Sequence, residues 1–404
     1  MDLNLGRFFD ANLSGGALLM AQKTKILRVI TRLNVGGPSC HVQLLMKNLD
    51  PGRFEQRLIV GSVPKGEIED EQAAKYVHGR LTSLKRSLSL ISDFQAVSQL
   101  KKEIATFQPD IIHSHQAKAG FLITRACSGS RQKVVHTYHG HTFSGYWGPI
   151  MGRMVIAAER KAARRRDLLV AQSNSQIEEI VGALGENLRP KMRLIPPAID
   201  LERLDPGRQQ ASLIRSELGL TRERVLVFLG RLAAIKNPAA FLRVVARVQK
   251  LSNEPVVALV VGGGTVEEEN RLHDLIDELD LRASIRWLGY RQDVSSILAL
   301  ADVCVSTSIN EGTPLSLLEA LYCGAKIAAF DVGGIRDILG KKEGVKLVDP
   351  RDEESLARVV HEHLLSNELG MQTVAETRKG LIQAYGIGRL AVDLQAVYEG
   401  LLRE

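Results

Sequence analysis

Short apolar runs alternate with amphipathic helical patterns along nearly the whole chain. In the first half, His41–Leu49 has the pattern of a helix and lies between two predicted strands. The strands predicted in this half are Ile26–Ile30, Phe54–Val60, Ile111–His115 and Val134–His139. Those predicted in the second half are Val225–Leu229, Val256–Val261, Ser284–Leu288, Val303–Ser306 and Ala325–Phe330. Because strands that alternate with helices pair in parallel, this pattern predicts an α/β protein with doubly wound parallel sheets.

A proline break divides the pattern into two halves. Residues Ile195–Asp200 read I-P-P-A-I-D and precede the polar stretch Asp205–Gln210, so we place an inter-domain linker here. The sequence predicts a loosely ordered leader at 1–22, domains at 23–200 and 201–385, and a final helix at 386–404. That helix needs a partner surface for one apolar stripe, so we expect it to pack across the domain junction. The stripe consists of Leu390, Leu394, Val397 and Leu401.

Composition limits the class of protein. A chain of 404 residues with 45% hydrophobic content can bury two ordinary cores. Its four cysteines form no C-x-x-C pair, which disfavours a disulfide framework or structural zinc and favours a reducing compartment. No apolar run approaches the roughly 18 residues of a membrane helix, and residues 1–22 lack the apolar core of a secretory signal. We therefore expect a soluble, cytoplasmic protein.

The net charge of +7 is modest, but much of it is local. Clustered cations favour contact with anionic lipid or a phosphorylated acceptor, although a solvated helix face explains them equally well. Nucleic-acid binding is disfavoured, because no aromatic residues interleave with the charges and no recognition motif accompanies them. Peripheral contact with the inner face of a membrane thus stays open. The cluster lies within one helical pattern and comprises Arg160, Lys161, Arg164, Arg165 and Arg166.

The most informative segment is Asn310–Glu319, which reads N-E-G-T-P-L-S-L-L-E between an apolar run and a helical pattern. Thr313 and Pro314 have the signature of a helix N-cap and first helical residue. A glycine-containing loop therefore leads into a helix whose free N–H groups can receive an anion. Glu311 lies in the loop, and Glu319 lies about a turn and a half into the helix. This arrangement suits a phosphate at the helix start with a hydroxylated sugar beside it.

Cations and glycines at other predicted strand ends point to the same chemistry. Arg231 and Lys236 follow the strand Val225–Leu229, and together they suit a diphosphate, although surface cations without a ligand give the same pattern. Gly262–Gly264 permits close backbone approach to a ligand, but it lacks the G-x-G-x-x-G spacing, so a plain tight turn explains it too. The pair Gly36–Gly37 precedes a helix and either approaches a phosphate or sugar or simply forms a turn.

Two histidine pairs, His113-x-His115 and His139-x-His141, end predicted strands. Alternate residues of a strand share a face, so a metal site must be considered. No carboxylate or cysteine completes the set, and a histidine at a strand end can equally bind a substrate hydroxyl. The balance favours no metal.

Taken in order, these motifs resemble those of the retaining glycosyltransferases of family 4, which have the GT-B fold of two Rossmann-like domains facing each other across a cleft. They cover nearly the whole chain, and several ordered motifs are far more specific than any one of them. In the first half they are V-G-G near Gly36, I-I-H-S-H-Q-A-K-A-G at Ile111–Gly120 and V-V-H-T-Y-H-G-H-T-F-S-G-Y at Val134–Tyr146. In the second half they are G-R-L-A-A-I-K-N from Gly230, V-V-G-G-G from Val260, W-L-G-Y-R-Q-D-V from Trp287, N-E-G-T-P-L-S-L-L-E-A-L from Asn310 and D-V-G-G-I-R-D-I-L from Asp331.

The resemblance implies a nucleotide sugar held mainly by the second domain. Glu319 matches the glutamate that bonds the ribose hydroxyls, and Glu311 matches the one that faces the transferred sugar. Arg231 and Lys236 match the diphosphate-binding pair. His139 resembles the histidine that contacts the donor sugar from the first domain. The other donor-binding positions that the resemblance implies are Gly37, Gly263, Leu288, Gly312, Thr313, Pro314 and Leu315.

The resemblance also implies transfer with retention of configuration and without a metal cofactor, and the chain contains no D-x-D triplet. We expect a hexose or hexosamine donor, linked to UDP first and to GDP second, and a glycan or lipid-linked acceptor in polysaccharide assembly. Two alternatives stay open: a non-hydrolysing sugar-nucleotide epimerase, and a scaffold that binds the nucleotide sugar without turnover. Two departures bear on the hinge and on donor preference. The linker P-P-A-I-D lacks the glycine of the usual N-G-V-D, and V-G-G-G stands where V-G-D-G or V-G-E-G is common.

Overall fold

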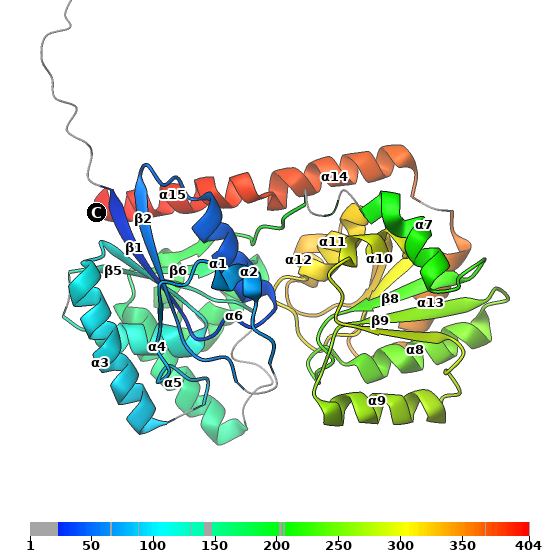
Figure 1. The fold of residues 1–404 in the computed structure, drawn as a ribbon, viewed down its shortest axis with the longest axis horizontal. Helices are drawn as coiled ribbons and strands as arrows, with labels where there is room; N and C mark the ends of the chain where they lie inside the picture. Colours follow the sequence, from blue (N-terminus) through cyan, green and yellow to red (C-terminus); the bar gives the residue numbers. More distant parts are fainter. Residues whose placement is uncertain are drawn as a thin grey trace, which may run out of the picture.

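The chain forms two parallel α/β domains, and its last two helices run along both of them (Figure 1). The computed structural model describes residues 23–64, 67–87, 89–129, 131–140, 148–201, 204, 207–367 and 369–403. The leader predicted at residues 1–22, and part of the polar stretch after the linker, therefore lie outside the described residues. In both domains, helices pack on the faces of a central sheet, as the βα alternation predicted.

The first sheet has seven parallel strands in the order β3-β2-β1-β4-β5-β6-β7. The strands are β1 (Thr24–Ile30), β2 (Phe54–Val60), β3 (Gly79–Arg80), β4 (Ile111–His115), β5 (Lys133–Thr137), β6 (Leu168–Ala171) and β7 (Met192–Leu194). The helices are α1 (Gly37–Asn48), α2 (Glu71–Ala74), α3 (Leu90–Phe107), α4 (Ala117–Ala126), α5 (Pro149–Arg165), α6 (Asn174–Leu184) and the 3-10 helix η1 (Glu186–Lys191). The pattern missed β3, β6 and β7, which are short strands of two, four and three residues.

The second sheet has six parallel strands in the order β10-β9-β8-β11-β12-β13. The strands are β8 (Arg224–Leu229), β9 (Val256–Val261), β10 (Ile285–Gly289), β11 (Val303–Ser306), β12 (Lys326–Phe330) and β13 (Val345–Val348). The helices are α7 (Gly207–Glu217), α8 (Pro238–Leu251), α9 (Val266–Glu278), α10 (Val294–Leu300), α11 (Leu315–Cys323), α12 (Ile335–Leu339), α13 (Glu353–Leu365), α14 (Met371–Tyr385) and α15 (Ile387–Arg403). The edge strand β13 was missed because it has no fully buried residue.

Both sheets have the same reversal of strand order. In the first sheet, β1 lies between β2 and β4, and in the second, β8 lies between β9 and β11. Loops leaving two such neighbouring strands turn away in opposite directions, which opens a crevice at the carboxyl ends of the strands. The loops after β1, β4, β8 and β11 are therefore where the fold can hold a ligand.

The C-terminal helix returns to the first domain. In Figure 1, α14 lies along the second domain and α15 along the first. Leu390, Leu394, Tyr398 and Leu401 of α15 are buried against β1 and α1 in one apolar cluster. The Tyr398 hydroxyl accepts a hydrogen bond of 2.9 Å from Nη1 of Arg28 on β1. At the end of α14, the backbone N–H of Ile199 donates to the carbonyl of Tyr385 at 2.8 Å. The linker and both terminal helices thus form one connected unit.

None of the helices in the described part of the chain is both long enough and apolar enough to cross a lipid bilayer.

Candidate functional site

The loop after β11 brings an acid and a cation together. The Glu311 side chain is buried at 9% exposure, and its Oε1 accepts a hydrogen bond of 2.7 Å from Ser308 Oγ. The same oxygen pairs with Nζ of Lys236, which belongs to the loop after β8. The two residues lie 75 positions apart in sequence and meet because β8 and β11 are neighbours in the sheet.

The start of α11 differs from the prediction. The helix begins at Leu315, and Pro314 takes the N-cap position with no side-chain capping bond. Pro314 has ψ of 71°, which no α-helix accommodates, so the helical conformation cannot begin before Leu315. Thr313 is therefore not the N-cap. Its hydroxyl is buried and has no hydrogen-bond partner among the described residues.

The helix α11 presents a half-buried face next to this loop. Leu315, Ser316 and Glu319 are all partly exposed, whereas Leu317, Leu318 and Ala320 are buried in the domain core. Glu319 also lies near Cys304 on β11. Burial raises the pKa of that thiol to about 12, and the charges of Cys323 and Glu319 add to the rise.

A third cation faces the same junction from the first domain. Arg32 follows β1, and its Nε pairs with Glu67 at 2.8 Å. Burial lowers the pKa of the Arg32 guanidinium; Glu67 raises it, and the charges of Arg86 and Arg231 lower it further. Arg231 is exposed and has no ion pair within the described ranges. Two guanidinium groups from different domains therefore lie within electrostatic reach of each other, an arrangement that an anion between them would stabilise. Sequence reasoning missed Arg32, although its place at the carboxyl end of β1 was a signal.

The glycines of the loop after β9 are explained by packing. At Gly262, whose φ is +134°, a Cβ atom would lie 1.9 Å from the carbonyl oxygen of Gly230. This residue must therefore be glycine for the β9 loop to lie against the β8 loop, and the tight-turn interpretation suffices for it. Gly263 is exposed at this loop, and Leu288 is half-buried near the end of β10. Their role in donor binding stays a prediction.

Several predicted residues meet across the domain junction. A Cβ atom on Gly37, at the start of α1, would lie 3.4 Å from Leu315 Cδ1 on α11. A Cβ atom on Gly312 would lie only 2.5 Å from Cα of Gly140, which follows β5. In the first turn of α6, the Ser175 backbone N–H donates to Oδ2 of Asp337, on α12, at 2.7 Å. The two domains therefore touch at the start of α11.

A group of histidines lies on the first-domain side of this contact. His139 comes two residues after β5 ends, rather than inside the strand as predicted, and it is half-buried. Its Nε2 is 3.0 Å from Nδ1 of His115, and its Nδ1 accepts from Gln172 Nε2 at 3.4 Å. Burial lowers the pKa of His139 to about 3, so its ring is neutral at ordinary pH. His41 of α1 completes a set of three rings whose nitrogens could hold a metal ion. His141 lies outside the described residues.

The other predicted histidine is part of a separate network. His113 shares a face of β4 with His115, and their ring centroids are 4.2 Å apart, as the alternation predicted. However, His113 Nε2 bonds Thr137 at 2.7 Å and its Nδ1 bonds the Tyr398 hydroxyl at 2.6 Å. Its nitrogens therefore hold α15 in place.

The basic cluster of α5 is smaller than predicted. Arg166 is fully buried, and its Nη1 pairs with Glu159 Oε1 at 2.5 Å, so it is a core residue rather than part of the surface. The other members, Arg160, Lys161, Arg164 and Arg165, are exposed. The first turns of the same helix expose Ile150, Met151 and Met154 to 78%, 41% and 63%.

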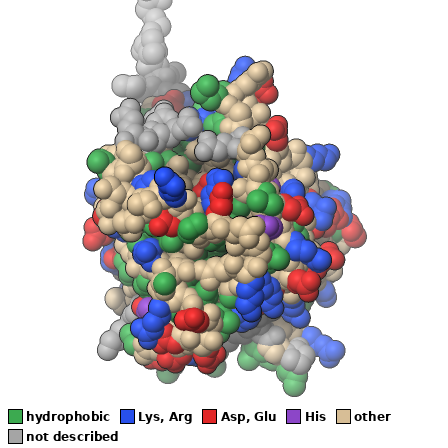
Figure 2. Space-filling model, turned by 90° about the vertical axis from the view of Figure 1, so that its right-hand side faces the viewer, with side chains coloured by type: hydrophobic (Ala, Val, Ile, Leu, Met, Phe, Trp, Pro, Cys, Tyr) green, Lys and Arg blue, Asp and Glu red, His purple; other side chains and the backbone are tan. Residues whose placement is uncertain are grey.

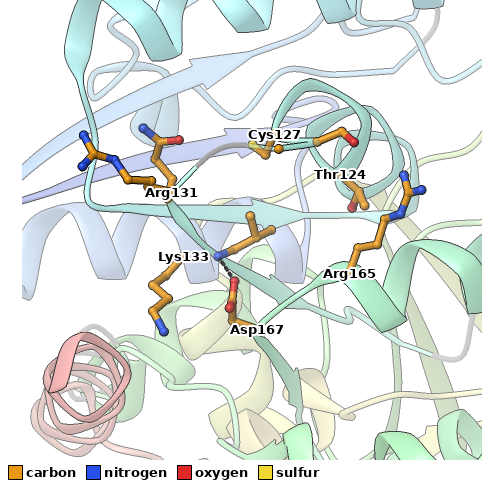
Figure 3. A pocket seen from close by; sticks show the side chains of 10 residues that line it. Thr124, Cys127, Arg131, Lys133, Arg165 and Asp167 are labelled. Carbon is orange, nitrogen blue, oxygen red and sulfur yellow. Dashed lines mark hydrogen bonds between the residues drawn. The ribbon is translucent and has the colours of Figure 1, made fainter. Parts of the chain in front are cut away.

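Two other surfaces carry less information about function. A cavity of about 470 Å³ is lined by Arg131, Lys133, Arg165 and Asp167 (Figure 3). Lys133 begins β5, so this cavity lies at the amino ends of the strands, and none of the predicted site residues lines it. Figure 2 shows the outer face of the second domain, where cationic and anionic side chains are interspersed rather than gathered by sign.

Comparison with known protein families covers most of the chain. The model described as "Glycosyltransferase Family 4" matches residues 35–203, and "Glycosyl transferases group 1" matches residues 211–380. These two segments correspond to the first and second sheets with most of their helices.

Similar proteins include two enzymes and one solved structure. A UDP-Gal:alpha-D-GlcNAc-diphosphoundecaprenol alpha-1,3-galactosyltransferase of Escherichia coli is 29% identical over 292 residues, 70% of this chain and 75% of that protein. A D-inositol 3-phosphate glycosyltransferase of Corynebacterium jeikeium is 30% identical over 220 residues, 52% of each chain. The Anabaena protein HepE, solved in complex with UDP and glucose, superimposes with a TM-score of 0.76 at 18% identity, covering 93% of this chain and all of that one. That last likeness concerns the fold alone.

Proposed function

This chain belongs to the GT-B glycosyltransferases of family 4, and we propose that it transfers a hexose or hexosamine from a UDP-sugar, with retention of configuration, to a lipid-linked glycan. The observation that carries the proposal is the ion pair of Lys236 and Glu311 at the switch point of the second sheet. Arg231 belongs to the same loop as Lys236 and lies within electrostatic reach of Arg32 of the first domain. A sugar diphosphate needs cations for its phosphates and a hydrogen-bond acceptor for its sugar hydroxyls, and this loop pair offers both.

Charge separation in the reaction gives each of these residues a task. Breaking the anomeric bond leaves positive charge on the sugar and negative charge on the departing diphosphate. In this proposal Arg231 and Lys236 stabilise the departing diphosphate by electrostatic preorganisation. The three cations of the junction supply this charge themselves, and we propose that no metal cofactor takes part.

The sugar lies between the two domains in this proposal. Glu311 orients it from the second domain and His139 from the first. Both nitrogens of His139 are engaged, but the 3.4 Å bond from Gln172 is the weaker one. A sugar hydroxyl that donates to Nδ1 of His139 would replace that bond. Glu319, on the half-buried face of α11, is the proposed partner of the ribose hydroxyls.

UDP is the proposed nucleotide, with GDP second, because the name of the Escherichia coli relative specifies UDP-galactose. The same name specifies a diphosphoundecaprenol-linked acceptor, which supports a lipid-linked acceptor here. An epimerase is the weaker alternative, because the matched families are transferases. Release of a free C2-epimer without any acceptor would reverse this ranking.

Donor binding is expected to depend on Glu319. Thermal-shift measurements with UDP-, GDP- and ADP-sugars should give the largest stabilisation with a UDP-sugar. Glu319→Ala should weaken that binding by about 1.5–3 kcal/mol, because charge-assisted hydrogen bonds to the ribose are lost. Glu278→Ala, an exposed glutamate on α9, is the matched control and should bind like wild type. Equal stabilisation of wild type and Glu319→Ala would exclude the ribose assignment.

We further propose that the exposed face of α5 rests on an anionic membrane that carries the acceptor. Apolar side chains on its first turns and four cations on its later turns are the composition of an interfacial helix. The double variant Lys161→Glu/Arg165→Glu should lower the affinity for anionic liposomes by at least about 30-fold at low salt, since each cation contributes about 1 kcal/mol. Liposome sedimentation measures this affinity. Lys250→Glu/Lys341→Glu on the second domain makes the same change in net charge and should have little effect. Equal losses in both double variants would mean that only net charge matters.

A further inference from the structure

Three histidines from separate elements converge beside the domain junction. His41 lies on α1, His115 ends β4 and His139 follows β5. One ring nitrogen from each lies within 4.8 Å of the others, and the ring centroid of His41 is 5.8 Å from that of His115 and 5.1 Å from that of His139. Three imidazoles at this spacing require an explanation, because two of them, His41 and His115, are buried.

Hydrogen bonding within the described residues leaves this group unsatisfied. His41 is 2% exposed, and neither Nδ1 nor Nε2 of its ring has a partner; His115 is fully buried, and its Nε2 has none. A buried polar atom that stays unpaired destabilises the folded protein. Gln172 is a donor to Nδ1 of His139, so the His139 proton is on Nε2 and points at His115 Nδ1, 3.0 Å away. One hydrogen bond joins the rings of His139 and His115, whereas the ring of His41 has no hydrogen bond among the described residues.

We propose that His41, His115 and His139 form a binding site for Zn²⁺ or a similar divalent transition metal. Three histidines are an established ligand set for zinc, with the fourth position left to water or substrate. A metal would take the place of the proton shared by His115 and His139, and it would also bond the unpaired ring of His41. Ligand chemistry selects against Mg²⁺ and Ca²⁺, which need oxygen ligands.

The surroundings fit this class of metal. His41 and His115 are buried, and each has a ring nitrogen without a hydrogen-bond partner among the described residues. With a metal on Nε2, the proton of His139 would move to Nδ1, and Gln172 would support the ring once its amide turns so that the oxygen accepts that N–H. Tetrahedral zinc with bonds of about 2.0–2.1 Å needs its nitrogens roughly 3.3 Å apart. The three nitrogens lie within 4.8 Å of one another, so the His41 ring must move inward by up to about 1.5 Å. The charge of Arg28 acts on His41 and reduces the affinity.

Metal binding would oppose sugar transfer, an inference that rests on the proposed function. His139 is the proposed sugar contact from the first domain, and a metal would hold its ring away from the donor. Zinc at this site would therefore inhibit an enzyme that otherwise works without a metal. The metal would enter past His139, the half-buried member of the three.

The test separates binding from activity. Full-length protein is stripped with a chelator and titrated with Zn²⁺ alone against a chromophoric chelator, without any nucleotide sugar. We expect one Zn²⁺ per chain in wild type and at least 100-fold weaker binding in His41→Ala. His361→Ala, on α13 of the second domain, is the matched control and should bind like wild type. Undiminished stoichiometric binding by folded His41→Ala would overturn the site.

A second measurement does not depend on any variant. Co²⁺ bound to wild type should give the intense visible bands of a site with four or five ligands, and Zn²⁺ should remove them. Absence of those bands, or only the weak spectrum of hydrated Co²⁺, would also overturn the site. Transfer is then assayed separately with metal-free enzyme: full turnover without metal and inhibition at one Zn²⁺ per chain support the inference. Turnover that fails in metal-free enzyme while binding persists would refute the proposed function and leave the metal site standing.

Discussion

Glu311→Gln should lower kcat by about 100- to 1000-fold, the usual loss when one preorganised electrostatic group at a reacting centre is removed. The substitution keeps the shape of the side chain and its bond with Ser308, but it removes the charge that pairs with Lys236. Lys236 is then free to bind the diphosphate, so UDP affinity should stay equal or increase. Steady-state kinetics and calorimetric titration with UDP measure the two effects separately. A kcat within a few-fold of wild type would show that Glu311 does not face the sugar.

Two further variants make this result specific. Glu343→Gln, in an exposed loop of the same domain, is the matched control for charge removal and should leave kcat unchanged. Glu311 and Lys236 are in direct contact, so Glu311→Gln and Lys236→Met should not be additive. Lys236→Met alone should weaken UDP binding, because it removes a phosphate contact and strands the buried Glu311 carboxylate. Additive losses would mean that the two side chains act at separate sites.

The site of the second domain could be predicted from sequence for a topological reason. Lys236 and Glu311 follow different strands, yet both strands end at the same edge of one parallel sheet. Apolar runs are enough to locate such strands, and loops after neighbouring strands necessarily emerge together. The predicted start of α11 was wrong by one residue. Pro314 has the sequence signature of a first helical residue, but its ψ of 71° keeps it outside the helix.

Interactions between elements far apart in sequence could not be predicted. Arg166 has the sequence context of a surface cation, but Glu159 lies seven positions earlier on the inner side of α5 and takes it into the core. His41 resembled an ordinary helix residue until the packing of α1 placed it against two strand ends. Arg32 and Arg231 come from different domains, so their proximity depends on how the domains are oriented. No local pattern encodes that orientation.

The contact between Gly312 and Gly140 makes that orientation testable. Both lie in loops that carry proposed site residues, and the backbones approach so closely that a methyl group on Gly312 would overlap Gly140. The three atoms nearest to a Cβ on Gly312 all belong to Gly140 of the first domain, so the tightest obstacle to alanine here is the domain contact. A substitution here therefore acts on the approach of the two domains and leaves each sheet intact.

Gly312→Ala should reduce kcat/KM by about 10- to 100-fold, because the added methyl group opposes the domain contact at an overpacking cost of about 1–3 kcal/mol. Binding of UDP to the second domain and the thermal stability of the protein should change little. Small-angle scattering with UDP-sugar present should report a larger radius of gyration than wild type. Gly182→Ala, in α6, adds a methyl group where no atom lies within 4 Å and should match wild type in both measurements. Wild-type kinetics in Gly312→Ala would mean that catalysis does not require the domains to meet as they do here.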